Sequence, residues 1–146
     1  MKFTIEKTDI RRPLGLLAKL PEFDNLKPYE HYAKMVDDKV QLNLVAKNEE
    51  GHVIGCKMGY DRYADGSFYS WLGGVRPEVR EMGVAQALAD YQENWARENG
   101  FTSIKFKTMN RHQAMLLFSI KNGFQIYNVK PKADIQDYRI ELIKNL

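Results

Sequence analysis

Hydrophobic and polar positions along the chain follow two periods, one typical of strands and one typical of helices. Between Val40 and Ala46, apolar residues occupy alternate positions, as they do in a half-buried strand. Further along, apolar residues recur at i, i+4, i+7 and i+11, which is the spacing of one buried helical face. These positions are Val84, Leu88, Tyr91 and Trp95. The pattern therefore predicts a chain that mixes strands with amphipathic helices.

The same patterns, with the turn residues between them, predict a complete order of elements. The predicted strands cover residues 2–8, 40–46, 52–62, 67–75, 101–108, 124–129 and 137–143, and the predicted helices begin near Pro13, near Pro28, at Val84 and near His112. Gly100 stands where the third helix needs a left-handed C-terminal residue. Strands two to four predict an antiparallel meander, whereas the helix between strands four and five predicts a parallel, right-handed crossover.

Together these elements predict an α+β, or mixed α/β, fold: a central mixed and mostly antiparallel sheet of about seven strands, flanked by helices. The chain suits a single domain, residues 1–146, because it shows no repeat and no Ser/Gly/Pro-rich linker. No apolar run is long enough to cross a bilayer, and charged residues interrupt the first residues before a signal-peptide core forms. We therefore expect a cytoplasmic protein.

Composition and charge narrow the chemistry. A formal charge of +3, spread along the chain, suits an anionic cofactor but falls short of the concentrated basic face of a nucleic-acid-binding protein. The single cysteine, Cys56, cannot form an intrachain disulfide, which suits a reducing compartment. The three histidines lack the spacing of metal ligands, so no metal site is expected.

Residues 75–85 place a strand end, a turn and a helix start in succession, which favours an anion-binding site. At a helix N-terminus the first backbone N–H groups lack intrahelical partners and the helix dipole is positive. The segment is neither a Walker loop nor a dinucleotide fingerprint, because it lacks the glycine spacing of both. It does match Arg/Gln-x-x-Gly-x-Gly/Ala, with Arg80, Gly83 and Ala85 in the defining places and Pro77 three residues before the arginine. The alternative is an ordinary strand-turn-helix connection whose glycine only eases the turn.

With this motif and this order of elements, the sequence resembles the GCN5-related N-acetyltransferase (GNAT) family over essentially all of its length. The resemblance implies a GNAT-type fold, splayed between strands four and five, with acetyl-coenzyme A (acetyl-CoA) as the cofactor. The loop would bind the pyrophosphate of the cofactor, and the pantetheine arm would lie between the splayed strands. Open main-chain edges there suit an extended arm that carries amide groups.

The resemblance also implies which residues bind the cofactor. Backbone groups of the loop would hold the pyrophosphate, and those at the end of strand four would lie along the acetyl group and the pantetheine arm. An asparagine after strand five would bond the arm. The cofactor-binding residues expected in this sequence are Gly73, Gly74, Val75, Arg80, Glu81, Met82, Gly83, Val84, Ala85, Gln86, Asn110 and Ser119.

Several of these residues have a second interpretation. Arg80 and Arg76 each add charge for the pyrophosphate or form a surface ion pair, and Gly73-Gly74 lies along the cofactor or marks a β-bulge. Asn110 bonds the pantetheine arm or caps the helix that follows it. Glu81 departs from the family pattern, which commonly has glycine there, so its carboxylate must point away from the phosphates.

Catalytic groups are harder to assign. In the family, a tyrosine four residues before Gly-Phe protonates the departing thiolate, and Ser119 stands at that position here. A serine hydroxyl is shorter and less acidic than a phenol, so Ser119 is a poor general acid that could hold a water or touch the sulfur. Asp61 is the candidate general base, with a solvent-facing turn residue as the alternative. Four aromatic residues either line the acceptor pocket or belong to the core: Tyr60, Tyr63, Tyr69 and Trp71.

Three functions remain open on these grounds. The first is an acetyl-CoA-dependent N-acetyltransferase that transfers an acetyl group to a primary amine by direct attack of the amine on the thioester. The second is a non-catalytic acyl-CoA-binding or sensing module, and the third is a structural protein without a cofactor. The expected acceptor is a small-molecule or peptide amine, and a homodimer is a family expectation. Neither a nucleic acid nor a membrane is expected as a partner.

Overall fold

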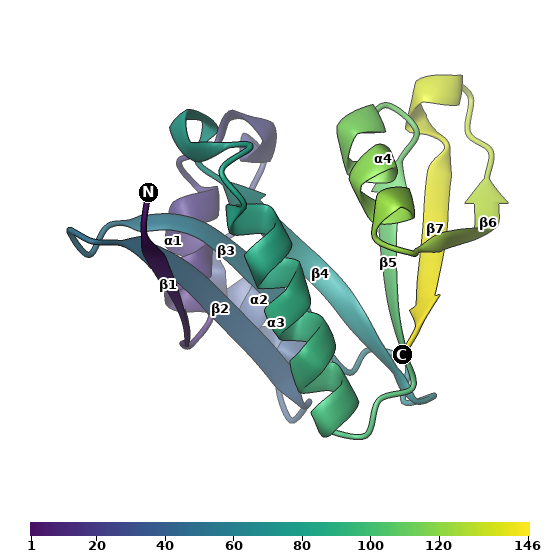
Figure 1. Cartoon of the computed structure of the whole chain (residues 1–146). Helices are drawn as coiled ribbons and strands as arrows, with labels where there is room; N and C mark the ends of the chain where they lie inside the picture. The colour runs from purple at the N-terminus through teal and green to yellow at the C-terminus, as the bar shows by residue number, and fades with distance from the viewer.

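Seven strands form one sheet in the order β1-β2-β3-β4-β5-β7-β6, and four α-helices pack on it (Figure 1). A computed structural model describes all 146 residues, Met1–Leu146. The strands are β1 Phe3–Lys7, β2 Gln41–Asn48, β3 Val53–Tyr60, β4 Ser67–Val75, β5 Ser103–Met109, β6 Gln125–Lys130 and β7 Arg139–Asn145. The helices are α1 Arg11–Leu17, α2 Tyr29–Val36, α3 Val84–Glu98 and α4 Gln113–Lys121, with 3-10 turns η1 Pro21–Phe23, η2 Pro77–Val79 and η3 Ile135–Asp137. None of the helices is both long and apolar enough to cross a membrane.

The predicted order of elements and fold class are confirmed, as are the two predicted strand relations. β2, β3 and β4 form an antiparallel meander, and β4 and β5 are parallel. The predicted terminal hairpin is also present, with β7 lying between β5 and β6 and pairing with both. α3 joins β4 to β5 across one face of the sheet, which is what makes this central pair parallel.

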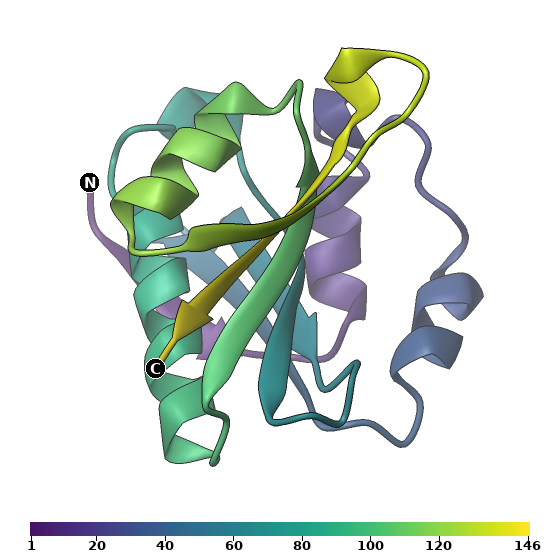
Figure 2. The ribbon, with the colours of Figure 1, turned by 90° about the vertical axis from the view of Figure 1, so that its right-hand side faces the viewer.

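The helices cover the two faces of the sheet in pairs. Figure 2 shows α3 and α4 on one side of the sheet and α1 and α2 on the other. Leu44 and Val45 are neighbours on β2 and point to opposite faces; Leu44 packs in the cluster under α3, and Val45 packs in the cluster under α1 and α2. The expectation of a half-buried strand at 40–46 is therefore wrong, because helices cover both of its faces.

Helix α3 lies with one stripe of side chains against the sheet. The buried positions recur every four residues and are Val84, Leu88, Gln92 and Ala96. Tyr91 and Trp95, which the pattern places on this face, lie at its edge and are only partly buried. The predicted left-handed residue after the helix is confirmed, since φ of Gly100 is +86°.

The sheet is splayed between β4 and β5, as the sequence predicts. The two strands pair only at Ser67 with Ser103, Phe68 with Ile104 and Tyr69 with Lys105. Beyond these pairs the strands diverge (Figure 1), and each continues beside its other neighbour, β4 with β3 and β5 with β7. We call the space between residues 70–75 of β4 and 106–109 of β5 the wedge.

A β-bulge lies where β4 leaves β5. Along β3, Met58 pairs with Leu72 and the next residue, Gly59, pairs with Ser70, so that Trp71 is the extra residue on β4. Bulges increase the local twist of a strand, which helps to turn the end of β4 away from β5. The alternative that Gly73-Gly74 marks the bulge is wrong, because both glycines pair regularly with β3.

Gly74 has a packing reason instead. A Cβ at this position would lie 2.5 Å from Leu20 Cδ1 and 3.2 Å from Leu17 Cδ2. We expect Gly74→Ala to lower the free energy of unfolding by about 1–3 kcal/mol through overpacking. Gly15→Ala is the matched control, since Gly15 lies in α1 with no atom within 4 Å of its Cβ position. That control should raise the free energy of unfolding by about 0.5–1 kcal/mol. Chemical denaturation measures both, and equal stabilities for the two variants would contradict this packing.

Candidate active site

The wedge presents two main-chain edges without strand partners. β4 runs on to Val75 bonded to β3 alone, and β5 runs on to Met109 bonded to β7 alone. Sheet edges of this kind bind extended segments that carry N–H and C=O groups. Three residues predicted to lie along the cofactor, Gly73, Gly74 and Val75, form the last part of the β4 edge. The wedge can therefore take an extended ligand with amide groups as an additional strand.

A row of free N–H groups lies next to the wedge, where the loop after β4 enters α3. None of the six backbone N–H groups of residues 81–86 donates a hydrogen bond to a protein atom, and no side chain caps the helix. Unpaired N–H groups at a helix start, together with the positive end of the helix dipole, bind anions such as phosphate. Met82 and Ala85 are exposed, so the row is open to a ligand.

Two left-handed residues shape this loop. Gly83, directly before α3, has a φ of +86°, and no atom lies within 4 Å of where its Cβ would be. The glycine is thus required by the backbone conformation rather than by crowding within the protein. Glu81 has a φ of +65°, a conformation that favours glycine, the residue the family commonly has there. Its side chain is exposed, so its carboxylate is free to turn away from a bound anion.

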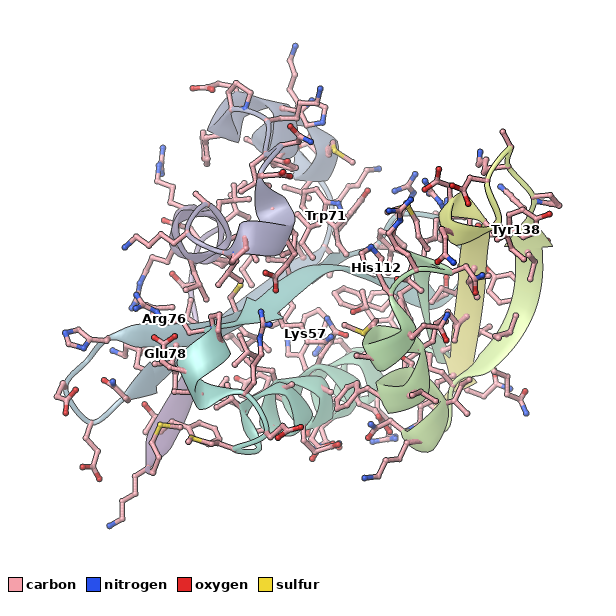
Figure 3. All side chains as sticks on the ribbon, turned by 90° about the horizontal axis from the view of Figure 1, so that it is seen from above. Lys57, Trp71, Arg76, Glu78, His112 and Tyr138 are labelled. Carbon is pink, nitrogen blue, oxygen red and sulfur yellow. The ribbon has the colours of Figure 1, made fainter.

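The two arginines of the loop are held by the protein in different ways. Arg80 forms an ion pair with Glu22 in η1, and its Nε donates to the carbonyl oxygen of Val75 at 3.2 Å. Arg76 donates from Nε to the carbonyl oxygen of Val53 at 2.8 Å and lies 3.7 Å from Glu78 (Figure 3). Both arginines therefore have the surface ion pair that the sequence left as one of their two roles. Arg80 lies closer to the free N–H groups along the chain, and its salt bridge is exposed.

Helix α4 lies beside the start of α3 and carries Ser119. The link between the helices is a 2.7 Å hydrogen bond from Gln86 Nε2 to Asn122 Oδ1. Ser119 lies one turn before Asn122, is only 4% exposed, and its Oγ contacts Met115 Sδ at 3.7 Å. The structure thus brings Ser119 to the same side of the sheet as the loop, on the buried face of α4.

Asn110 lies at the end of β5, but it does not cap α4. The N-cap of α4 is His112, and no side chain caps this helix. Asn110 instead donates from its backbone to Tyr138 O at 2.9 Å and from Nδ2 to Ile135 O at 3.2 Å. The helix-cap interpretation of Asn110 is therefore wrong, and its side chain fixes the end of β5 to the segment before β7.

Asp61 is separated from the other predicted site residues. It follows Tyr60, which pairs with Tyr69 at the closed end of the wedge. Gly73 lies four residues further along β4, towards the open end. Asp61 Oδ1 accepts a hydrogen bond from Ala64 N at 3.1 Å and so closes the turn between β3 and β4. Its position is that of the turn residue that the sequence left as the alternative to a base.

The four predicted aromatic residues form one cluster on the face that carries α1 and α2. The ring of Tyr60 lies 5.0 Å from Trp71 and 5.8 Å from Tyr69, and Tyr63 lies 5.9 Å from Tyr69. The Arg62 guanidinium lies 5.0 Å above the Tyr69 ring. Burial raises the pKa of Tyr69 to about 12, so its phenol stays protonated at neutral pH. The cluster borders the wedge through Trp71.

Lys57 is a residue at this site that the sequence interpretation missed. It lies on β3 and pairs with Gly73, and its side chain has no hydrogen bond or ion pair. Figure 3 shows Trp71 on one face of β4 and Lys57 on the other, with His112 and Tyr138 across the wedge. A lysine inside an otherwise apolar strand, flanked by Gly55 and Gly59, is a signal that could have identified it.

An open pocket of about 650 Å³ lies away from the wedge, between the end of β1 and α2, and no predicted site residue lines it. We place the site at the wedge because unpaired strand edges and free N–H groups are the features that bind an extended, anionic ligand. No group of three or more His, Cys, Asp and Glu side chains is arranged to hold a metal ion.

Comparison with known proteins assigns this fold. The sequence model of the acetyltransferase (GNAT) family matches residues 14–124. A GCN5-related N-acetyltransferase from Kribbella flavida has a TM-score of 0.80 at 18% identity, covering 99% of this chain and 98% of that one. The IAA acetyltransferase from Bacillus cereus ATCC 14579 has a TM-score of 0.79 at 19% identity, covering 99% and 100%. A GNAT family acetyltransferase from Elizabethkingia anophelis, solved with acetyl-CoA bound, has a TM-score of 0.77 at 16% identity, covering 99% and 98%. No curated protein matches the chain significantly.

The family match covers most of the chain, and the wedge and loop lie within it. The protein is therefore an enzyme of the acetyl-transferring class. It belongs to the GNAT family of acetyltransferases. The family, fold and enzyme class predicted from the sequence are confirmed, and acetyl-CoA is the cosubstrate that agrees with them.

Gly83 and Gly51 offer a matched test of the loop. Both have a left-handed φ, +86° and +83°, and neither has an atom within 4 Å of its Cβ position, but Gly51 lies in the turn between β2 and β3. Valine at either position should destabilise the fold by a similar amount, about 1–3 kcal/mol. Only Gly83→Val should weaken acetyl-CoA binding, by roughly tenfold or more, because the free N–H groups lose their common direction. Calorimetry checks this, and unchanged affinity in Gly83→Val would refute the anion-binding loop.

Proposed function

We propose that this protein is an acetyl-CoA-dependent N-acetyltransferase that acetylates the primary amine of a small-molecule or peptide acceptor. The observation that carries the proposal is the row of six free N–H groups at residues 81–86, directly beside two unpaired strand edges. An anionic group and an extended amide-bearing arm in one ligand fit these two features together. A pyrophosphate joined to a pantetheine arm has this combination.

In this proposal the loop binds the pyrophosphate mainly through its backbone. The N–H groups of Glu81 through Gln86 donate to the phosphate oxygens, and Arg80 adds a positive charge. Arg80 is already held by Glu22, so its charge is partly compensated before the ligand binds. Backbone donors therefore supply most of the affinity, which fits a loop whose glycine at position 83 is needed for its conformation.

The end of β4 supplies the groups for acetyl transfer. A backbone N–H of residues 73–75 would polarise the thioester carbonyl and stabilise the negative charge as the amine attacks, an effect of roughly 3 kcal/mol for one donor. Asn110 would bond the pantetheine arm from the β5 side of the wedge. The acceptor would approach along the aromatic cluster of Tyr60, Tyr69 and Trp71.

Direct attack of the amine is favoured over a covalent enzyme intermediate. Cys56 is the sole cysteine of the chain, and it is buried on the face that packs against α1. Burial raises the pKa of its thiol to about 12, so the reactive thiolate is absent at neutral pH. Its Sγ lies 3.7 Å from the carbonyl oxygen of Pro13 rather than towards the wedge.

A second candidate function is a non-catalytic acyl-CoA-binding or sensing module. It is supported by Ser119 in place of the family's tyrosine and by the position of Asp61 at the closed end of the wedge. In that case the loop and the wedge would bind the same ligand without turnover.

Two measurements on the purified protein separate these functions. Calorimetry with acetyl-CoA should give saturable binding, whereas no binding would refute both functions. Release of free thiol from acetyl-CoA, followed with a panel of small amines and peptides, should rise above the amine-free rate for at least one acceptor class. Binding without amine-dependent thiol release across the panel would refute the transferase and favour the sensing module.

A further inference from the structure

Lys57 is a partly buried cation beside the wedge, and it has no partner. The loop between β4 and α3 carries Arg76 and Arg80, paired with Glu78 and Glu22. On β5, Lys105 is paired with Asp65 at 2.9 Å and Lys107 with Glu141 at 3.6 Å. Lys57 forms neither an ion pair nor a hydrogen bond.

Lys57 lies beside β4 where that strand has lost β5. Lys57 pairs with Gly73, and a Cβ on Gly73 would lie 3.7 Å from Lys57 Cγ, so the stem of the lysine lies on the same face as the Gly73 edge, at van der Waals distance from it. On the same face of β3, Gly55 is covered by Val84 and Leu88, and Gly59 is covered by Phe68. These contacts leave the wedge side of Gly73 as the open direction. Figure 3 shows Lys57 on the side of β4 that carries α3 and α4.

Taking acetyl transfer as proposed above, we infer that the Lys57 ammonium faces the sulfur of the bound thioester and donates its proton to the departing thiolate. The amine nitrogen bonds to the acetyl carbon, the C–S bond breaks with its electron pair on sulfur, and the proton from Lys57 Nζ converts the thiolate to a thiol. The acceptor amine loses its proton to solvent. The neutral lysine then takes up a proton from solvent and is an ammonium again. Lys57 would thus supply the proton that Ser119, engaged with Met115, is a poor group to supply.

The protonation equilibrium of Lys57 suits this step. Burial lowers the pKa of Lys57 to about 8, close to that of a thiol, and proton transfer is efficient between groups of matched acidity. Besides burial, the one group that acts on this pKa is the thiol of the preceding residue, Cys56, which lies on the opposite face and acts to raise it. The buried residues that face this side of the sheet include no charged group: Leu44 on β2, Val84, Leu88 and Gln92 on α3, and Leu116 and Ser119 on α4.

The first test needs binding alone. The thiol pKa of free coenzyme A bound to the protein is measured from the ultraviolet absorbance of its thiolate as pH rises. An ammonium beside the sulfur should lower that pKa by about one unit relative to coenzyme A in water, a roughly tenfold rise in thiolate at a given pH. Lys57→Met should abolish the lowering and Lys57→Arg should keep it, because arginine keeps the charge. Lys47→Met, which removes a lysine of β2 paired with Glu6, is the control that should change nothing.

The second test uses turnover. Because the lysine must be protonated, its contribution is present below pH 8 and is lost as pH rises through 8. The wild-type kcat should therefore fall above pH 8. In Lys57→Met, kcat should be lower by about a hundredfold at neutral pH, with little change in the KM for acetyl-CoA. The kcat of this variant should not fall above pH 8. In Lys57→Arg, kcat should also be low, since arginine does not release a proton at these pH values.

The outcomes separate this inference from the transferase proposal. Equal thiol pKa values in wild type and Lys57→Met would overturn the inference even if the enzyme turns over. A lowered thiol pKa that Lys57→Met removes would support it even if no acceptor is found and the transferase proposal fails. Failure of coenzyme A to bind the wild-type protein would overturn both. Thermal unfolding of each variant establishes that it is folded before either test.

Discussion

The site depends on one constraint, which is that the parallel pairing of β4 and β5 ends after three residue pairs. Each strand stays in the sheet because its other neighbour holds it, β3 for β4 and β7 for β5. The bulge at Trp71 and the crossover through α3 keep the two strands apart beyond that point. Main-chain edges left open in the middle of a sheet favour an extended ligand that pairs with them.

The loop after β4 also presents main-chain groups without partners, and these favour a negatively charged ligand. Its N–H groups point outward from a helix start, with a left-handed glycine directly before the helix, and the cations nearest to it are compensated by carboxylates of the protein. A loop of this kind is arranged before the ligand arrives and loses little freedom on binding. Lys57 differs from Arg76 and Arg80, since it meets no carboxylate and lies against Gly73 at the strand edge.

The order of elements, the parallel crossover and the loop could be predicted from the sequence because each depends on local pattern: periodicity, turn residues and a short motif. Features that depend on which elements meet in space could not. Val45 is buried because α1 and α2 cover the second face of β2, and Trp71 rather than Gly73 forms the bulge because of the register with β3. The turn position of Asp61 and the place of Lys57 opposite Gly73 follow from the same register.

Hydrogen–deuterium exchange tests most directly whether the wedge and the loop bind one extended ligand together. In the free protein, the amides of residues 81–86 should exchange quickly, because none has an acceptor in the protein. Saturating acetyl-CoA should slow exchange at 81–86 and at 71–75 of β4 together, and leave β1 at the far edge of the sheet unchanged. Protection of the loop without β4, or of neither segment, would contradict the account.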